Sequence, residues 1–166
     1  MTGNYQSQIQ YYDSSVIWES VEGGNYFVLC MGFRSSQGHF SIVVTEVDAP
    51  GNDDCSNATL IDPSGDIVEG STILAKYDEN LKYCGTATNK TSGGVWFTFP
   101  GTGGTLSLGV AGLFDTQVSL YKGANCGKLV CVDGNDESQV ASFSSTLIVT
   151  TIVNETYYVL GKSSET

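Results

Sequence analysis

The chain has 166 residues, 40% of them apolar, and a formal net charge of −11 with seven Lys and Arg and one His. An acidic surface repels phosphate groups and anionic lipids, so the composition argues against nucleic acids and membrane surfaces as partners. Cations or basic protein patches fit the charge better, but the favoured interpretation is that acidity only keeps an extracellular protein soluble. The apolar content suffices for a packed core, and 20 Gly with three Pro are typical of a turn-rich all-β protein. No apolar run approaches the ~20 residues that insert across a bilayer, and Met1 is not followed by a signal peptide.

An internal repeat organises the chain, since residues 1–35 align without a gap with residues 132–166. Nine of the 35 aligned pairs are identical, Tyr26 with Tyr157 among them, whereas shared composition alone gives roughly two or three. The offset of 131 residues (132 minus 1) indicates whole domains in tandem rather than a solenoid. We therefore expect the chain to be cut from a longer polypeptide, in preference to having lost a leader.

The first unit is expected over residues 1–48, as the C-terminal half of a preceding β-sandwich. Alternation of apolar and polar residues predicts its strands, which we place at residues 9–12, 16–20, 26–31 and 39–47. In the last of these, Phe40, Ile42 and Val44 share one face. Residues 49–52 form a short joint to the next unit.

Residues 53–166 are expected to form the second unit, an antiparallel β-sandwich of jelly-roll-like type. It opens with Cys55, Ala58 and Ile61 at three-residue spacing, which predicts one short helical turn. Alternating β-branched and aromatic residues, separated by Gly and Pro, predict antiparallel strands with one buried face. We place them at residues 71–75, 95–99, 105–110, 116–121, 129–132, 147–152 and 156–160. A counterpart of strand 39–47 is missing, so we expect neighbouring polypeptide, from the continuing chain or another subunit, to complete both units.

Several segments of the second unit resemble the bacterial pre-peptidase C-terminal domain, in the cysteine-containing variant of large secreted repeat proteins. They are NDDCSNATLI (52–61), CG (84–85), GGVWFTF (93–99), GTGGTLSLGV (101–110), FDTQVSLYKGANCGKLVCVDGND (114–136) and TYYVLG (156–161). The resemblance implies a jelly-roll-like sandwich without catalytic residues, which binds, spaces or targets other domains of peptidases, adhesins and surface proteins. This sequence contains no peptidase domain, so the link to peptidases is one of context.

The five cysteines are expected to form two disulfides and leave one thiol. The spacing of Cys126 and Cys131 suits a bridge across a tight hairpin, and elimination together with the family resemblance then pairs Cys55 with Cys84. Cys30 is left over and is expected to be buried on its strand. Zinc is the rival use of cysteine, but the sequence lacks two CxxC pairs. Disulfides imply an oxidising compartment, so we expect a secreted or cell-surface protein.

Four residues form a candidate calcium site. Asp133, Asn135 and Asp136, with Asp115 from a neighbouring connection, offer the hard oxygen ligands that calcium requires. Asp, Asn and Gly also make ordinary hairpin turns, and the first copy lacks both of the aligned aspartates. The fold is therefore not expected to depend on calcium.

Three Asn-X-Thr sequons begin at Asn57, Asn89 and Asn154. They predict glycosylation only if the source is a secreting eukaryote, in which case Asn89 is expected to be modified first.

No arrangement of residues indicates an enzyme, because His39 has no nearby acid and the common hydrolase and phosphate-binding motifs are absent. We expect a non-catalytic repeat of an extracellular surface, adhesive or filament-forming protein, whose partners are neighbouring copies of the repeat. The alternative is an appendage of a secreted peptidase or other hydrolase that binds carbohydrate or protein. Trp18, Trp96 and the nine tyrosines could stack on glycans, although at strand spacing such residues more often pack in a core.

Overall fold

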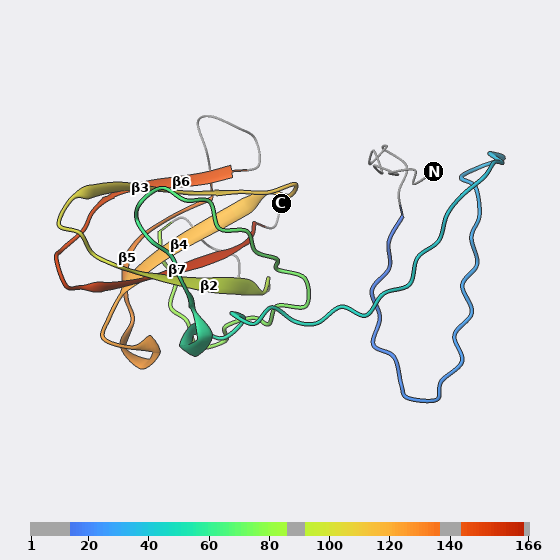
Figure 1. Ribbon diagram of the computed structural model, residues 1–166, viewed down its shortest axis with the longest axis horizontal. Helices are drawn as coiled ribbons and strands as arrows, with labels where there is room; N and C mark the ends of the chain where they lie inside the picture. The colour runs from blue at the N-terminus through green and yellow to red at the C-terminus, as the bar shows by residue number, and fades with distance from the viewer. Residues whose placement is uncertain (1–13, 86–91, 137–143, 165–166) are drawn as a thin grey trace, which may run out of the picture. The chain divides into compact units, whose positions relative to one another are not determined.

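The computed structural model describes residues 14–85, 92–136 and 144–164, and the chain divides into two units, Met1–Val44 and Thr45–Thr166. The described part is all-β, with two short 3-10 turns (Figure 1). Its elements are η1 (Cys55–Asn57), β1 (Thr59–Leu60), β2 (Gly94–Pro100), β3 (Thr105–Ala111), β4 (Thr116–Lys122), η2 (Cys126–Lys128), β5 (Val130–Asn135), β6 (Ser144–Thr150) and β7 (Thr156–Ser163).

The described residues of the first unit contain no helix or strand. The strands predicted at 16–20, 26–31 and 39–47 are therefore wrong, while the one at 9–12 lies outside the described residues. Trp18 and Tyr26 approach within 5.9 Å of each other between ring centroids, and the Val21 amide donates to the Tyr26 hydroxyl. Period-two patterning alone does not make a strand, because the backbone groups of a strand need partners on a neighbouring strand.

The second unit confirms most of the predicted elements. Strands form at six of the seven predicted positions, and a 3-10 turn begins at Cys55. The strand predicted at 71–75 is wrong, because the chain turns at Ile73 and Leu74, where Leu74 has a φ of 60°. A β-branched or bulky residue rarely adopts this left-handed conformation, and a strand cannot pass through it.

Two sheets are built from these strands. The larger has five strands in the order β1-β2-β7-β4-β5, and the smaller pairs β3 with β6. All pairs are antiparallel except β1 with β2. In Figure 1 the β3–β6 pair forms a layer apart from the larger sheet. One apolar core joins the sheets, with Phe99 and Tyr157 stacked at 5.3 Å and packed with Val118, Leu120, Leu147, Val149 and Val159.

A second apolar cluster lies on the opposite face of the five-stranded sheet. Trp96, Tyr121 and Leu160 alternate along their strands with residues of the first core, and Cys84 packs on them. Because this outer face is covered, β4 is buried from Thr116 to Tyr121 on both faces. The expectation of one buried face is thus wrong for β4. The cover consists of irregular chain around η1, η2 and Leu81.

Candidate functional site

Trp96 of β2 is the centre of the covered face and is almost fully buried. Its backbone amide donates to the Asn52 carbonyl at 2.8 Å, and its own carbonyl accepts from the Asn52 side chain at 2.8 Å. The indole Nε1 donates to the Asp78 carboxylate at 3.2 Å, and the Tyr121 ring lies 5.9 Å away. Trp96 thus binds the chain before η1 through Asn52, and it binds the covering loop (residues 61–85, which follow β1) through Asp78.

Asp78 is the most unusual titratable group of this face. Burial raises the pKa of its carboxyl group, and the nearby Asp53 and Asp54 raise it further, whereas the Trp96 hydrogen bond and Lys162 oppose the shift. Asp53 itself accepts the Lys76 amide at 2.6 Å. The Asp78 carboxylate thus accepts the Trp96 hydrogen bond at an energetic cost, because burial disfavours its charged form.

Tyr121 of β4 binds the covering loop near Cys84. Its hydroxyl donates to the Lys82 carbonyl at 3.0 Å, and burial raises the pKa of the phenol to about 12. The phenol therefore stays protonated at physiological pH and acts as a donor to the backbone. It does not act as a base.

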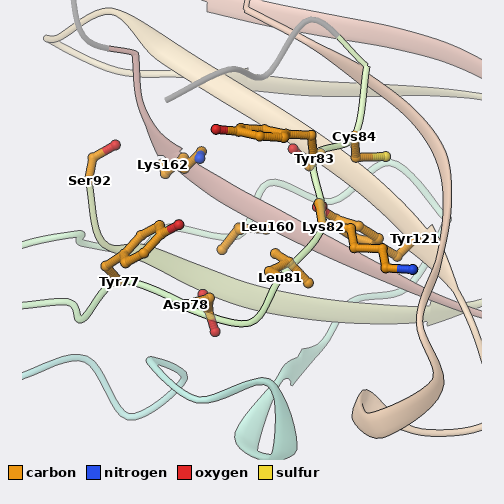
Figure 2. Close-up of a pocket in the computed structure, with 11 residues that line it drawn as sticks. Tyr77, Asp78, Leu81, Lys82, Tyr83, Cys84, Ser92, Tyr121, Leu160 and Lys162 are labelled. Carbon is orange, nitrogen blue, oxygen red and sulfur yellow. The ribbon is translucent and has the colours of Figure 1, made fainter. Parts of the chain in front are cut away.

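A small hollow lies between this loop and the sheet (Figure 2). Its volume is about 20 Å³, which is room for about one water molecule. Tyr77 and Tyr83 stand at its border with Ser92 and the buried Lys162. A hollow of this size can hydrate the polar groups at its wall but cannot enclose a small-molecule substrate.

Gln117 of β4 lies beside Lys162 in the strand register and is 1% exposed. Its Oε1 is buried and receives no hydrogen bond within the described part of the chain. A buried amide oxygen without a donor is uncommon in folded proteins, and nothing in its surroundings accounts for it.

Two disulfides fasten the covering layer, and their pairing corrects the prediction. Cys55 bonds Cys126, and Cys84 bonds Cys131. The predicted Cys55–Cys84 and Cys126–Cys131 bridges fail because residues 126–131 are not a hairpin. Cys126 belongs to η2, in the connection between β4 and β5, and faces η1, whereas Cys131 lies on β5 opposite Tyr121.

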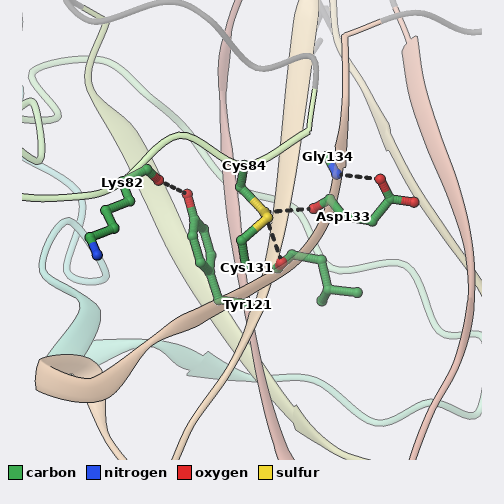
Figure 3. Close-up of a disulfide and its surroundings, with 7 residues drawn as sticks. Lys82, Cys84, Tyr121, Cys131, Asp133 and Gly134 are labelled. Carbon is green, nitrogen blue, oxygen red and sulfur yellow. Dashed lines mark hydrogen bonds between the residues drawn. A yellow bond between two sulfur atoms is a disulfide. The ribbon is translucent and has the colours of Figure 1, made fainter.

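The Cys84–Cys131 bridge joins the covering loop to β5 beside Tyr121 (Figure 3). The Cys84 sulfur is 3.2 Å from the Leu120 carbonyl oxygen and 3.1 Å from that of Asp133. A disulfide sulfur carries no hydrogen, so these are close polar contacts and not hydrogen bonds. They show how tightly the loop meets the sheet at this point.

Two glycines make that close approach possible. A Cβ on Gly134 would lie 2.1 Å from the Cys84 carbonyl oxygen, and one on Gly85 would lie 2.1 Å from the Gly134 carbonyl oxygen. Gly85 also has a φ of 68°, in the left-handed region that favours glycine. The backbones therefore touch directly, and any side chain would separate loop and sheet.

Three of the four candidate calcium ligands make hydrogen bonds within the fold. The Asp133 carboxylate accepts the Gly134 amide at 2.8 Å, and the Asn135 side chain donates to the Thr146 carbonyl at 3.0 Å. Asp115 accepts Ser164 through its backbone oxygen, and Asp136 follows the end of β5. Among the described residues, no three His, Cys, Asp or Glu side chains are grouped as a metal site. Calcium binding stays a prediction.

The remaining predicted positions are scattered. Asn57 in η1 and Asn154 in a turn are exposed, whereas Asn89 lies outside the described residues. Cys30 is an unpaired thiol, as expected, but it is exposed rather than buried. His39 is exposed as well. No helix in the described ranges combines the length and apolar character needed to cross a membrane.

Sequence reasoning singled out Cys84 and Trp96 of the covered face but missed its polar residues Asp78 and Lys162. Asp78 and Lys162 stand in stretches with no motif, so no local pattern marks them. The sequence Cys84-Gly85 could have predicted one contact of this face, because a glycine beside a disulfide cysteine permits a close approach of two backbones.

Comparison of the chain with models of known protein families, with curated proteins and with solved structures found no match.

Proposed function

We propose that this chain is a non-catalytic structural module of a secreted or cell-surface protein, built of tandem β-sandwich repeats of about 131 residues. The resemblance to the pre-peptidase C-terminal domain belongs to this proposal. So does a role in surface, adhesive or filament-forming assemblies.

One observation carries the proposal, namely the way the two disulfides interleave. Cys84 lies inside the loop closed by Cys55 and Cys126, and Cys131 lies outside it. η1 is thereby fastened to η2, in the connection between β4 and β5, and the irregular chain that leads to β2 is fastened to β5. Disulfides persist in oxidising environments, where such cross-links stabilise small domains. The polar groups of the covered face are used in the same attachment, as Asp78 binds Trp96 and Tyr121 binds the Lys82 backbone.

A specific observation favours a second candidate, a carbohydrate-binding appendage. Tyr77 and Tyr83 are 37% and 50% exposed and border the hollow that Ser92 and Lys162 also line. Tyrosine offers an apolar ring with a polar tip, which suits a surface that receives sugar rings.

A single set of experiments separates these functions. Antibodies against the chain should label the surface of intact source cells or their medium, and labelling confined to the cell interior would contradict the structural proposal. On a glycan array the structural module should bind nothing. Binding that is lost in Tyr83→Ala but kept in Phe114→Ala, an exposed aromatic away from the hollow, would establish the appendage instead. Turnover of peptide, ester or glycoside substrates that a single substitution abolishes would overturn both.

A further inference from the structure

The outer edge of β3 carries backbone groups that no other strand uses within residues 14–85, 92–136 and 144–164. β3 pairs with β6 on one side, and no strand among the described residues pairs with its other side. The Thr151 amide donates to the Gly104 carbonyl at 2.9 Å, in register with the β3–β6 ladder. Hydrogen-bonded and non-hydrogen-bonded residue pairs alternate along an antiparallel ladder. The backbone groups of Leu106 and Leu108 are therefore bonded to β6. Ser107 therefore points its amide and carbonyl away from β6.

The core is open on this same side. Ser145, Leu147 and Val149 of β6 face the core and are 0%, 5% and 8% exposed. The core-facing residues of β3 are only half-buried, although they belong to the same two-stranded layer; they are Leu106, Leu108 and Val110. A further strand beside β3 would cover them, whereas one beside β6 would not.

The β3 edge also lacks the features that prevent strand addition. Folded proteins blunt edge strands with charges, Pro or bulges. The sequence of β3, TLSLGVA, contains no charge and no Pro, and its seven pairs with β6 run without a shift in register. On the larger sheet, by contrast, the β5 edge has a register shift opposite Leu120 and Tyr121 and carries Asp133.

The repeat identifies a strand that fits this edge. With an offset of 131, Ser14 aligns with Ser145 of β6 and Tyr26 with Tyr157 of β7. Residues 39–47 therefore represent the segment that follows β7 in the repeat. Their apolar face is exposed and belongs to no strand, with Phe40, Ile42 and Val44 at 71%, 57% and 69%. No charge interrupts the segment between Phe40 and Thr45.

We propose that β3 accepts residues 39–47 of a second copy of this chain as an added strand. The inference rests on the proposed structural function and names its partner. Backbone bonds to the free edge would supply affinity, and the alternating apolar side chains would cover the open core, as in other cases of strand addition. Donor and acceptor are different segments of the chain, so each copy can give one strand and accept another, and the contact links copies head to tail.

Sedimentation velocity on the full chain, over a range of concentrations and with Cys30→Ser to prevent random cross-linking, tests the inference. The chain should form a concentration-dependent series of species. Ser107→Pro removes the edge amide and should abolish every species above the monomer, whereas Ser107→Ala should not. Ile42→Lys places a charge on the donor's apolar face and should act like Ser107→Pro. Val43→Lys, with the same charge on the other face, should still assemble.

The decisive sample mixes Ser107→Pro, which keeps an intact donor, with Ile42→Lys, which keeps an intact acceptor. They should form a 1:1 dimer and nothing larger, and this result also shows that both variants are folded. A mixture that stays monomeric, or single variants that assemble like the parent, would overturn the inference. A parent chain that stays monomeric would overturn it too. Protection of the outward-pointing Ser107 and Gly109 amides would then show that the chain closes this edge by itself. Surface labelling of source cells would be unaffected by that failure, so the broader structural function can be judged separately.

Discussion

Two copies of one sequence pattern stand in opposite environments in this molecule. In the second copy the side chains of β7 that pack in the two apolar clusters are buried, while their aligned partners in the first copy are exposed. The exposed fractions are 2% for Tyr157 against 47% for Tyr26, 2% for Val159 against 54% for Val28, and 3% for Leu160 against 79% for Leu29.

The difference lies in what surrounds each copy and not in the side chains themselves. β7 is paired on one side with β2 and on the other with β4, so both of its edges are used. The aligned residues of the first copy have no strand on either side within the described chain. An alternating pattern therefore makes a strand possible, and neighbouring strands make it stable.

Removal of the Cys84–Cys131 disulfide is expected to have the largest effect on the difference in burial between the two segments. Replacing Cys84 and Cys131 together with Ser opens a loop of 47 residues and should lower the free energy of unfolding by about 2–4 kcal/mol. Amide exchange at Tyr157 should then move toward that at Tyr26. Cys30→Ser serves as the control, because this thiol is exposed and unpaired. Equal stability of the double variant and the control, measured by denaturant unfolding, would show that the bridge contributes nothing.

Gly134→Ala tests whether the covering loop must touch the sheet. The new Cβ would meet the Cys84 carbonyl oxygen at 2.1 Å, so loop and β5 must separate. We expect a loss of about 3 kcal/mol in thermal or denaturant unfolding. Gly109→Ala is the matched control, since its Cβ would meet only Thr146 Oγ1 at 3.9 Å. If the two variants unfold alike, the contact is not needed for burial of the outer face.

The smallest expected effect concerns the pH dependence that Asp78 gives to the stability of the second unit. Its folded pKa is raised above the ordinary value of 3.8, so between these two values the folded state binds more protons than the unfolded state. Stability from this group is therefore greatest at low pH and declines as pH rises through the window. Asp78→Asn keeps an acceptor for Trp96 and should gain stability over the parent at pH 7 but not at pH 3. Unfolding curves at both pH values, with the exposed Asp66→Asn as control, measure this gain. A gain of the same size at both would show that charge is not the cause.

The candidate site was less predictable from sequence than the strands. Alternation located β2, β3 and β4 because side chains on a strand point to opposite faces in turn, a local property. Alternation could not show that Gln117 and Ser119 of β4 would be covered as well. On that same face the cover of Tyr121 comes from chain around η1 and Leu81, which is far away in sequence. The disulfide pairing failed for the same reason, since Cys126 faces η1 rather than its neighbour Cys131.

The sequence by itself determined the all-β class, six strand positions of the second unit and the alignment of its end with residues 1–35. These follow from periodicity, composition and internal identity, which need no knowledge of contacts. Only the tertiary structure decided the pairing of the cysteines, the raised pKa of Asp78, the touching backbones of Gly85 and Gly134, and the open edge of β3. Each of these depends on which distant segments become neighbours, and burial and hydrogen bonding act only between neighbours in space.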